Sequence, residues 1–480
     1  MRPSIILTFL ICLAAITETK AQNFSIGKYD TLHSNILNED RQILVHVPSG
    51  AQNNDVRYPV MYLLDGENHF TKTVGIIDHL STTAGNELCP QMIVVAIFHP
   101  NREKDLIPPS SKEDKTKDHF PEFLEQELFP YINSHYPTEP YRILVGHSLG
   151  GLRVINTMVY QPQLFNSYIA LDPSLGMVKN WIGNATTEFN KIDYTGKSLY
   201  IAMGMTMPKG MDTAVIFRDT SGNARHMRCI MTFARNAEST INNGLDFNWR
   251  YYPDETHQSV VFKGTYDGLI ANFPWYKNEK LFDIFKPDVG AEASVRIMTD
   301  YYESLSKKMG YSQVAPEQGT SELIDYLTFK RWYDKALAFA QLNFKNYPNS
   351  KNAKMQLDAS LWNTKKSISE LKSTKTANEI YKLCKKEAAK KEPEYNISEN
   401  AINTLGYEFM QNNKLADAEL IFKLNVELYP YSYNVYDSYG ECLLAKDQEK
   451  EGIAAYRKSL KLNPDNSNAR KIIEKYDRNK

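Results

Sequence analysis

Cysteine is scarce in this sequence: the 480 residues contain five, and no two of them form a Cys-x-x-Cys pair. Cys12 falls in an N-terminal apolar segment, and the other four are Cys89, Cys229, Cys384 and Cys442. Recurring cysteine spacings are the usual sign of a disulfide framework, and Cys-x-x-Cys pairs are the usual sign of a structural zinc site. The sequence therefore predicts neither, although isolated pairs remain open to oxidation.

An excess of charge of either sign is also missing, because 56 Lys and Arg oppose 57 Asp and Glu. A net charge of −1 supplies no field that would attract nucleic acid or an anionic membrane. The lysine-rich run from Lys365 to Lys391 is a local exception, which we interpret as the solvated face of a helix. We therefore expect no nucleic-acid partner.

Long apolar runs are absent after the N-terminus, so no stable membrane span is predicted. Residues 1–21 have the pattern of a signal peptide: Arg2, a short apolar core, and the small Ala21 before the expected cut. Ile11 precedes Cys12 where a lipoprotein signal has a small residue. These features predict an exported protein, either periplasmic or secreted.

Residues 22–285 alternate strand-like and helix-like segments. The strand-like runs, rich in β-branched and aromatic residues, are 58–64, 91–98, 141–146, 167–172, 198–204 and 247–253. Residues 120–136 place apolar side chains at a helical period. Near-continuous apolar strands joined by helices indicate an α/β domain, in which a mostly parallel sheet is covered on both faces.

The sequence pattern changes after residue 285, where no further strand-like runs occur. Residues 286–325 are interpreted as a linker or helical connection, and 326–480 as an all-α repeat domain. Small, aromatic, Leu and Pro positions recur at a spacing of 34 residues: Gly406 and Gly440, Phe422 and Tyr456, Leu428 and Leu462, Pro430 and Pro464. This pattern resembles the tetratricopeptide repeat, which commonly docks a protein or peptide partner. The alternative is a structural helical cap on the first domain.

The segment RILVGHSLGGLRV, residues 142–154, places a serine between glycines at a strand-to-helix turn. Gly146-His147-Ser148-Leu149-Gly150 fits the Gly-x-Ser-x-Gly pattern, in which a strained turn presents the serine hydroxyl above the sheet. We interpret Ser148 as a nucleophile. The alternative interpretation is an ordinary glycine turn.

A serine hydroxyl needs a base, and in this fold class the chain order is Ser, acid, His. Only His226 and His257 follow Ser148 in the sequence. His257 lies in a polar loop after the last strand, which favours it as the base. His226 falls within a predicted helix and is interpreted as a surface or packing residue.

The acid is expected after the strand 198–204, beside the histidine loop. Asp212 is the first carboxylate there, and Asp219, Asp254 and Glu255 are the alternatives. A Ser–His dyad is also physically possible, because the acid only orients the imidazole and stabilises its charged form. Asp172, at the end of another strand, is expected instead to line the pocket.

An oxyanion hole needs two backbone N–H donors. Leu149, directly after the serine, supplies one candidate. The turn Asp65-Gly66-Glu67 follows an early strand and supplies the N–H of Glu67 as the second. A plain strand-ending Asp-Gly turn is the alternative.

Taken together, these segments resemble the putative-esterase family of α/β-hydrolases, which includes siderophore esterases, feruloyl esterases and mycolyltransferase-like proteins. The resemblance covers roughly residues 24–275 and rests on segments that occur in the family order: YPVMYLLDGENHF, NREKDLIPP, FLEQELFPYINSHYP, RILVGHSLGGL, LDPSL and DETHQSVVFKGTYDGL. It implies serine ester hydrolysis with Ser148 as nucleophile, His257 as base, and the amides of Glu67 and Leu149 as oxyanion donors.

Two departures from the family pattern stand out. The family often has His-Gly where this chain has His257-Gln258. Its Ser-Pro-Ser loop reads Asp172-Pro173-Ser174 here, and of the tryptophans expected after it only Trp181 is present. These departures argue against a siderophore-type pocket. Such a pocket would need cations to bind an anionic ligand, and Arg102 and Arg153 are available for this.

We therefore expect an exported serine hydrolase that cleaves a small-molecule carboxylic ester, such as a siderophore, feruloyl or acetyl ester, without a metal or organic cofactor. The alternatives are acyl transfer at the same site, or a catalytically degenerate hydrolase that acts as a binding or scaffold protein.

Overall fold

A computed structural model describes residues 25–49, 56–82, 87–109, 118–207, 213–240 and 243–478. The predicted signal peptide and Asp212 lie outside these ranges. The chain divides into two compact units, each described by itself. The first unit runs to Asn278 and includes Leu305–Tyr311, and the second comprises Glu279–Ser304 and Ser312–Lys480.

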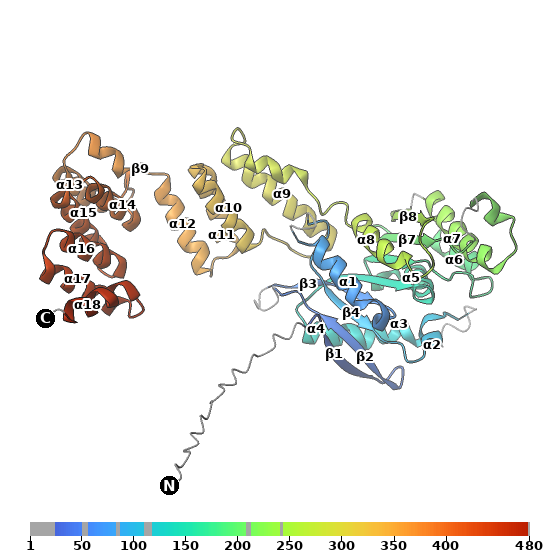
Figure 1. The fold of residues 1–480 in the computed structure, drawn as a ribbon. Helices are drawn as coiled ribbons and strands as arrows, with labels where there is room; N and C mark the ends of the chain where they lie inside the picture. The colour runs from blue at the N-terminus through green and yellow to red at the C-terminus, as the bar shows by residue number, and fades with distance from the viewer. Residues whose placement is uncertain are drawn as a thin grey trace, which may run out of the picture. The chain divides into compact units, whose positions relative to one another are not determined.

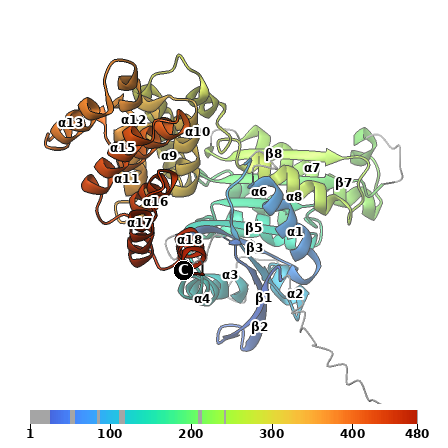
Figure 2. The same ribbon diagram turned by 60° about the vertical axis from the view of Figure 1, so that its left-hand side comes forward.

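The first unit is built on an eight-stranded sheet (Figures 1 and 2) with the strand order β1-β2-β4-β3-β5-β6-β7-β8. The strands are β1 (Lys28–Ser34), β2 (Glu39–His46), β3 (Tyr58–Leu63), β4 (Ile93–Ile97), β5 (Thr138–His147), β6 (Ser167–Leu171), β7 (Ser198–Gly204) and β8 (Asp246–Tyr252). The antiparallel strands β1 and β2 form one edge, and the other six strands, β3 to β8, run parallel to one another.

The six predicted strands correspond to β3 through β8, which confirms the α/β fold. The sequence reasoning missed β1 and β2, whose mixed exposure gives a less apolar pattern than the buried strands. The predicted helix 120–136 is one continuous helical segment: α3 (His119–Phe123), a π-helical turn (Leu124–Leu128) and α4 (Phe129–His135).

Helices cover both faces of the sheet, because alternate side chains of the buried strands enter two separate cores. Met61 and Leu63 of β3 pack beneath α1 (Gly66–Leu80) and α8 (Val260–Asn272). Tyr62 enters the opposite core. That core also contains side chains of α3, α4, α5 (Leu149–Tyr160), α6 (Trp181–Phe189) and α7 (Gly222–Ser239).

Parallel strands end at the same edge of the sheet, which brings the functional loops together. Ser148 follows β5, Asp172 follows β6, and His257 lies between β8 and α8. Among the described residues, Cys89, Cys229, Cys384 and Cys442 are free thiols. Among the described residues, none of the helices has the length and apolar composition needed to span a lipid bilayer.

The second unit is almost entirely helical. Its helices include α10 (Glu317–Phe329), α11 (Tyr333–Asn346), α12 (Lys351–Asn363), α13 (Ala377–Ala388), α14 (Glu399–Gln411), α15 (Leu415–Leu428), α16 (Tyr433–Ala445), α17 (Glu449–Leu462) and α18 (Ser467–Arg478). The interval 286–325 contains α9 (Ala291–Met309) and the first part of α10. Contrary to the expectation of no strands, β9 (Lys366–Ser367) and β10 (Tyr395–Asn396) form a short parallel pair.

The residues that recur every 34 positions are packing partners within helix pairs. A Cβ atom at Gly406 of α14 would lie 2.6 Å from the ring of Phe422 on α15. The equivalent atom at Gly440 of α16 would lie 2.9 Å from the ring of Tyr456 on α17. Glycine is therefore needed at both positions so that the helix carrying the aromatic ring can approach closely.

Candidate active site

Ser148 lies in the sharp turn between β5 and α5 with a strained backbone, φ 59° and ψ −114°. A Cβ atom at Gly146 would lie 2.5 Å from the backbone of Gly150, so only glycine fits before the turn. A Cβ atom at Gly151 would lie 2.9 Å from Pro173. These contacts explain the glycines around the serine, and a strained serine at a strand-to-helix turn is the geometry of a nucleophile elbow.

The Ser148 hydroxyl lies beside the loop that follows β6. Ser148 Oγ is 3.1 Å from Ser174 Oγ, and the Ser174 N–H donates to the Ser148 carbonyl at 2.9 Å. The Ser148 N–H donates to the carbonyl of Leu171. The loop that contains Asp172 is therefore hydrogen-bonded directly to the turn at Ser148.

Asp172 and His257 form the closest polar contact of the site. Asp172 Oδ2 accepts a hydrogen bond of 2.5 Å from His257 Nδ1. The other oxygen, Oδ1, accepts from the N–H of Gly204 at the end of β7. The side chain of Asp172 is fully buried, whereas that of His257 is 30% exposed. This arrangement fixes the Nδ1–H tautomer of His257, which leaves Nε2 free to accept a proton.

The ionisation of Asp172 follows from these contacts. Burial alone would raise its pKa, but hydrogen bonds from His226 and His257 outweigh burial and hold the pKa of the carboxyl below its usual value. Asp172 is therefore an anion at neutral pH and can stabilise a positive charge on His257.

His147, the residue before the serine, contacts the loop that carries His257. Its Nε2–H donates to the carbonyl of His257 at 2.7 Å, and the two ring centroids are 4.6 Å apart. Burial, followed by the neighbouring His257, lowers the pKa of His147 to about 4. His147 is consequently neutral near pH 7 and holds His257 beside the nucleophile turn without adding charge.

His226 contacts the same carboxylate as His257. Its Nε2 lies 3.0 Å from Asp172 Oδ2, and its side chain is 18% exposed. The sequence interpretation of His226 as a surface or packing residue is therefore wrong. His226 lies in the second turn of α7, whose start is near the carboxyl end of the sheet, and this position is set by tertiary packing.

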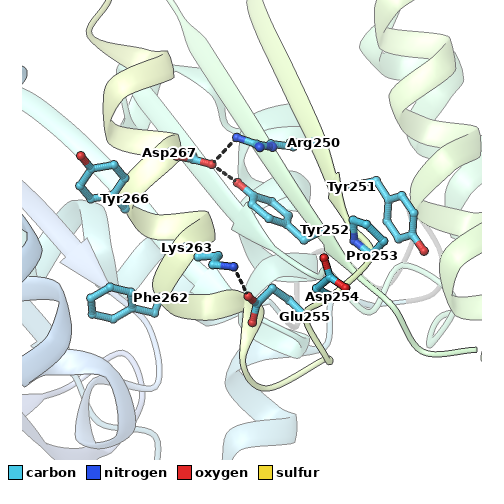
Figure 3. A pocket seen from close by; sticks show the side chains of 10 residues that line it. All are labelled: Arg250, Tyr251, Tyr252, Pro253, Asp254, Glu255, Phe262, Lys263, Tyr266 and Asp267. Atoms are coloured by element: carbon cyan, nitrogen blue, oxygen red, sulfur yellow. Dashed lines mark hydrogen bonds and ion pairs between the residues drawn. The ribbon is translucent and has the colours of Figure 1, made fainter. Parts of the chain in front are cut away.

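The predicted acid, Asp212, lies outside the described residues. Of its alternatives, Asp219 accepts a hydrogen bond from the N–H of Ser221. Asp254 and Glu255 line a separate cavity of about 510 Å³ beside α8 (Figure 3), where Glu255 pairs with Lys263 at 2.5 Å. In the described part of the chain, Asp172 is the carboxylate that contacts His257. It was expected to line the pocket, but it is fully buried and is not among the residues that line the cavity beside Ser148.

The candidate oxyanion turn, at the start of α1, is held by an ion pair. Asp65 adopts a left-handed conformation with φ 51°. Its carboxylate accepts two hydrogen bonds from Arg102, at 2.6 and 2.9 Å. A Cβ atom at Gly150 would lie 3.2 Å from Asp65 Oδ2, so this turn and the nucleophile turn are adjacent. Glu67 and Leu149 both occupy first turns of helices, where backbone N–H groups lack intrahelical acceptors.

A cavity of about 450 Å³ opens beside Ser148. It is lined by Asp65, Asn68, His69, Lys72, Arg102, His147, Ser148 and Gln258. Burial lowers the pKa of Lys72, and burial together with Lys72 lowers the pKa of His69 to about 4. Arg153 is absent from this wall, because it is fully buried and pairs with Asp118 at 2.6 Å. Of the two arginines considered for a siderophore-type pocket, only Arg102 lines the cavity.

The fold and the elbow serine define the first unit as an α/β-hydrolase. Residues 34–223 match the model of the family described as "Putative esterase". The first unit is therefore similar to this esterase family over these residues.

Two curated relatives share part of this unit. The ferri-bacillibactin esterase of Bacillus subtilis is 30% identical over 155 residues, which are 28% of this chain and 53% of that protein. The siderophore triacetylfusarinine C esterase of Aspergillus fumigatus is 28% identical over 131 residues, which are 24% of this chain and 44% of that protein. The chain thus spans about half the length of the curated relatives it matches.

A solved structure is similar over a longer stretch. The crystal structure of an IroE-like serine hydrolase from Shewanella oneidensis is 29% identical and has a TM-score of 0.52. The match covers 66% of this chain and 98% of that chain.

Proposed function

We propose that this protein hydrolyses a carboxylic ester through an acyl-serine intermediate, with Ser148 as nucleophile, His257 as general base and Asp172 as the acid of the triad. The 2.5 Å contact between Asp172 and His257, beside the strained Ser148, is the observation that carries the proposal. Asp172 replaces Asp212 in this role because its contact fixes the required tautomer of His257.

Each step uses a group already at the site. The Ser148 hydroxyl turns from Ser174 toward His257 Nε2, gives up its proton and attacks the ester carbon. The N–H groups of Glu67 and Leu149 donate to the tetrahedral oxyanion, and each such donor typically contributes about 3–4 kcal/mol. The C–O bond then breaks, and His257 returns the proton to the leaving alcohol. A water molecule repeats the sequence on the acyl-serine and releases the acid.

The substrate class follows from the cavity and the relatives. Lys72 lines the cavity beside Ser148 and would attract an ester that carries negative charge, whereas the charge of Arg102 is balanced by Asp65. The curated relatives are named a ferri-bacillibactin esterase and a siderophore triacetylfusarinine C esterase. We therefore place siderophore esters first, and feruloyl and acetyl esters second.

Labelling with a fluorophosphonate probe tests the proposal directly, because the probe bonds only to an activated serine. The wild-type protein should be labelled at Ser148 and should hydrolyse p-nitrophenyl acetate. Ser148→Ala should lose labelling and about 10⁶-fold in turnover, the usual loss when a triad nucleophile is removed. Equal hydrolysis by both proteins would contradict the proposal.

The alternatives give different results in the same assay. An acyltransferase would label at Ser148, and an added sugar or other alcohol would compete with water for the acyl group. A degenerate hydrolase that serves as a scaffold would not label at all. The described strain at Ser148 and the Asp172–His257 hydrogen bond favour an active site over the degenerate form.

Two further parts of the proposal concern the rest of the chain. Residues 1–21 would direct export to the periplasm or beyond, which fractionation of cells expressing the full-length chain would test. The helix pairs α14–α15 and α16–α17 would dock a protein or peptide in the manner of tetratricopeptide repeats. Pull-down with and without residues 326–480 would test that docking.

A further inference from the structure

A triad acid needs one imidazole partner, whereas Asp172 has two. His257 Nδ1 and His226 Nε2 lie 2.5 and 3.0 Å from the same oxygen, Oδ2. The second imidazole comes from α7 and has no part in the proton transfers described above. Two imidazoles and one carboxylate that converge on a point are the donor set of a transition-metal site.

We infer that Asp172, His226 and His257 form a binding site for Zn²⁺ or a similar transition-metal ion, and that the bound ion inhibits the enzyme. This inference rests on the proposed function, because His257 serves both as base and as ligand. The three donor atoms lie within 4.8 Å of one another, and no other group of this kind is found in the described ranges.

The donor chemistry fits zinc better than a hard cation. Zinc commonly binds two histidines and one carboxylate and leaves a fourth position for water, whereas Ca²⁺ and Mg²⁺ require several oxygen ligands. The two histidine side chains are 18% and 30% exposed, so an ion and its water can reach them from solvent. The carboxylate is buried and supplies the negative charge.

Binding requires a small adjustment. With metal–ligand distances of about 2.0–2.1 Å, tetrahedral donors are separated by more than the 2.5 Å that joins Asp172 and His257. The two N–H hydrogens that now point at Oδ2 must leave that space, and the side chains must separate by roughly 1 Å. Each neutral imidazole achieves the first change by moving its proton to its other nitrogen.

That tautomer change is the reason for inhibition. With metal on Nδ1, the proton of His257 resides on Nε2, and this nitrogen can no longer accept the proton of Ser148. The positive ion also lowers the basicity of the ring. Removing the ion restores the Nδ1–H tautomer and the hydrogen bond to Asp172, so the inhibition is reversible.

Zinc titration of the esterase, freed of metal with a chelator, tests the inference. Micromolar Zn²⁺ should inhibit the wild-type protein, and chelator should restore activity. His226→Gln keeps an N–H donor for Asp172 but loses the imidazole ligand. Loss of even an outer-shell partner costs about 10–100-fold in metal affinity, so this variant should need at least about tenfold more Zn²⁺. His79→Gln, at an exposed histidine of α1, should match the wild type.

Co²⁺ binding to Ser148→Ala gives a readout that does not depend on catalysis. The visible absorption band of four-coordinate Co²⁺ should appear in this variant and disappear when His226→Gln is added. Equal zinc sensitivity of the wild type and His226→Gln would overturn the inference, and so would the absence of the cobalt band. If chelator-treated wild type hydrolyses no ester, the proposed function fails, while the cobalt band still decides whether the metal site exists.

Discussion

Asp172 Oδ2 lies 2.5 Å from His257 Nδ1, although 85 residues separate them in the chain. The contact crosses the end of β7, because Asp172 follows β6, His257 follows β8, and β7 lies between these strands. Gly204, the last residue of β7, donates to the other oxygen of the carboxylate. Asp172 thus extends from β6, the strand beside β5, and its carboxylate is fixed in place by β7, the next strand along the sheet.

Gly146 must stay glycine for the nucleophile turn to form. Gly146→Ala places a Cβ atom 2.5 Å from the backbone of Gly150, where neither backbone can yield. We expect ester hydrolysis to be abolished and the melting temperature to fall. Gly75→Ala is the matched control, because nothing lies within 4 Å of that Cβ atom and it should stabilise α1 by about 0.5–1 kcal/mol. Similar melting temperatures for the two variants would refute the steric argument.

The Asp65–Arg102 ion pair should position the oxyanion turn. Arg102→Gln leaves the carboxylate of Asp65, which is 3% exposed, without its charged partner. We expect stability to fall by about 1–3 kcal/mol. The kcat for uncharged p-nitrophenyl acetate should fall about 10–100-fold, because small displacements of catalytic groups have effects of this size.

The double variant Asp65→Asn/Arg102→Gln is the control for that experiment. It removes the unpaired charge and should recover much of the lost stability, as measured by urea unfolding. If Arg102→Gln changes only the KM for anionic esters, the arginine contacts substrate and does not support the turn.

His69 should make the first unit sensitive to acid. Its pKa falls from an ordinary value near 6.5 to about 4 in the folded protein, so the unfolded chain binds the proton more tightly. Stability contributed by neutral His69 is therefore complete above pH 7 and is lost as the pH falls toward 4. Between pH 7 and 5 the expected loss is about 2 kcal/mol. Urea unfolding gives the free energy of unfolding at pH 7 and at pH 5. The difference between the two values should be smaller by about 2 kcal/mol in His69→Leu than in the wild type. An equal difference in both proteins would contradict the lowered pKa of His69.

The repeat glycines of the second unit should be intolerant of larger residues. Gly406→Ala would bring a Cβ atom to 2.6 Å from the ring of Phe422 and should cost about 1–3 kcal/mol through overpacking. Gly319→Ala, in α10 with open space around it, should not destabilise. Thermal unfolding of the two variants compares them directly, and equal midpoints would show that the helix pair does not depend on the close approach.

The sequence predicted the parallel strands and the elbow well, because both have strong local signals. The strands β3 to β7 are near-continuous apolar runs. Ser148 is flanked in sequence by Gly146 and Gly150, which mark the turn. The partner of His257 was harder to predict, because the sequence reasoning favoured carboxylates after β7 and β8 and expected Asp172 only to line the pocket. The available signal was Asp172 itself, an acidic residue directly after a buried strand and next to Pro173. The roles of His226 and Arg102 had no local signal, since their contacts depend on where α7 and the segment after β4 pack.

The most direct test of the account compares Asp172→Asn with Asp212→Asn in kcat for a p-nitrophenyl ester. Asparagine at position 172 cannot hold the Nδ1–H tautomer of His257, so kcat should fall by about 10⁴-fold, the loss typical of this change. The Asp212→Asn variant should retain kcat near the wild-type value. The opposite pattern, with activity lost at position 212 and kept at position 172, would contradict the triad Ser148–His257–Asp172.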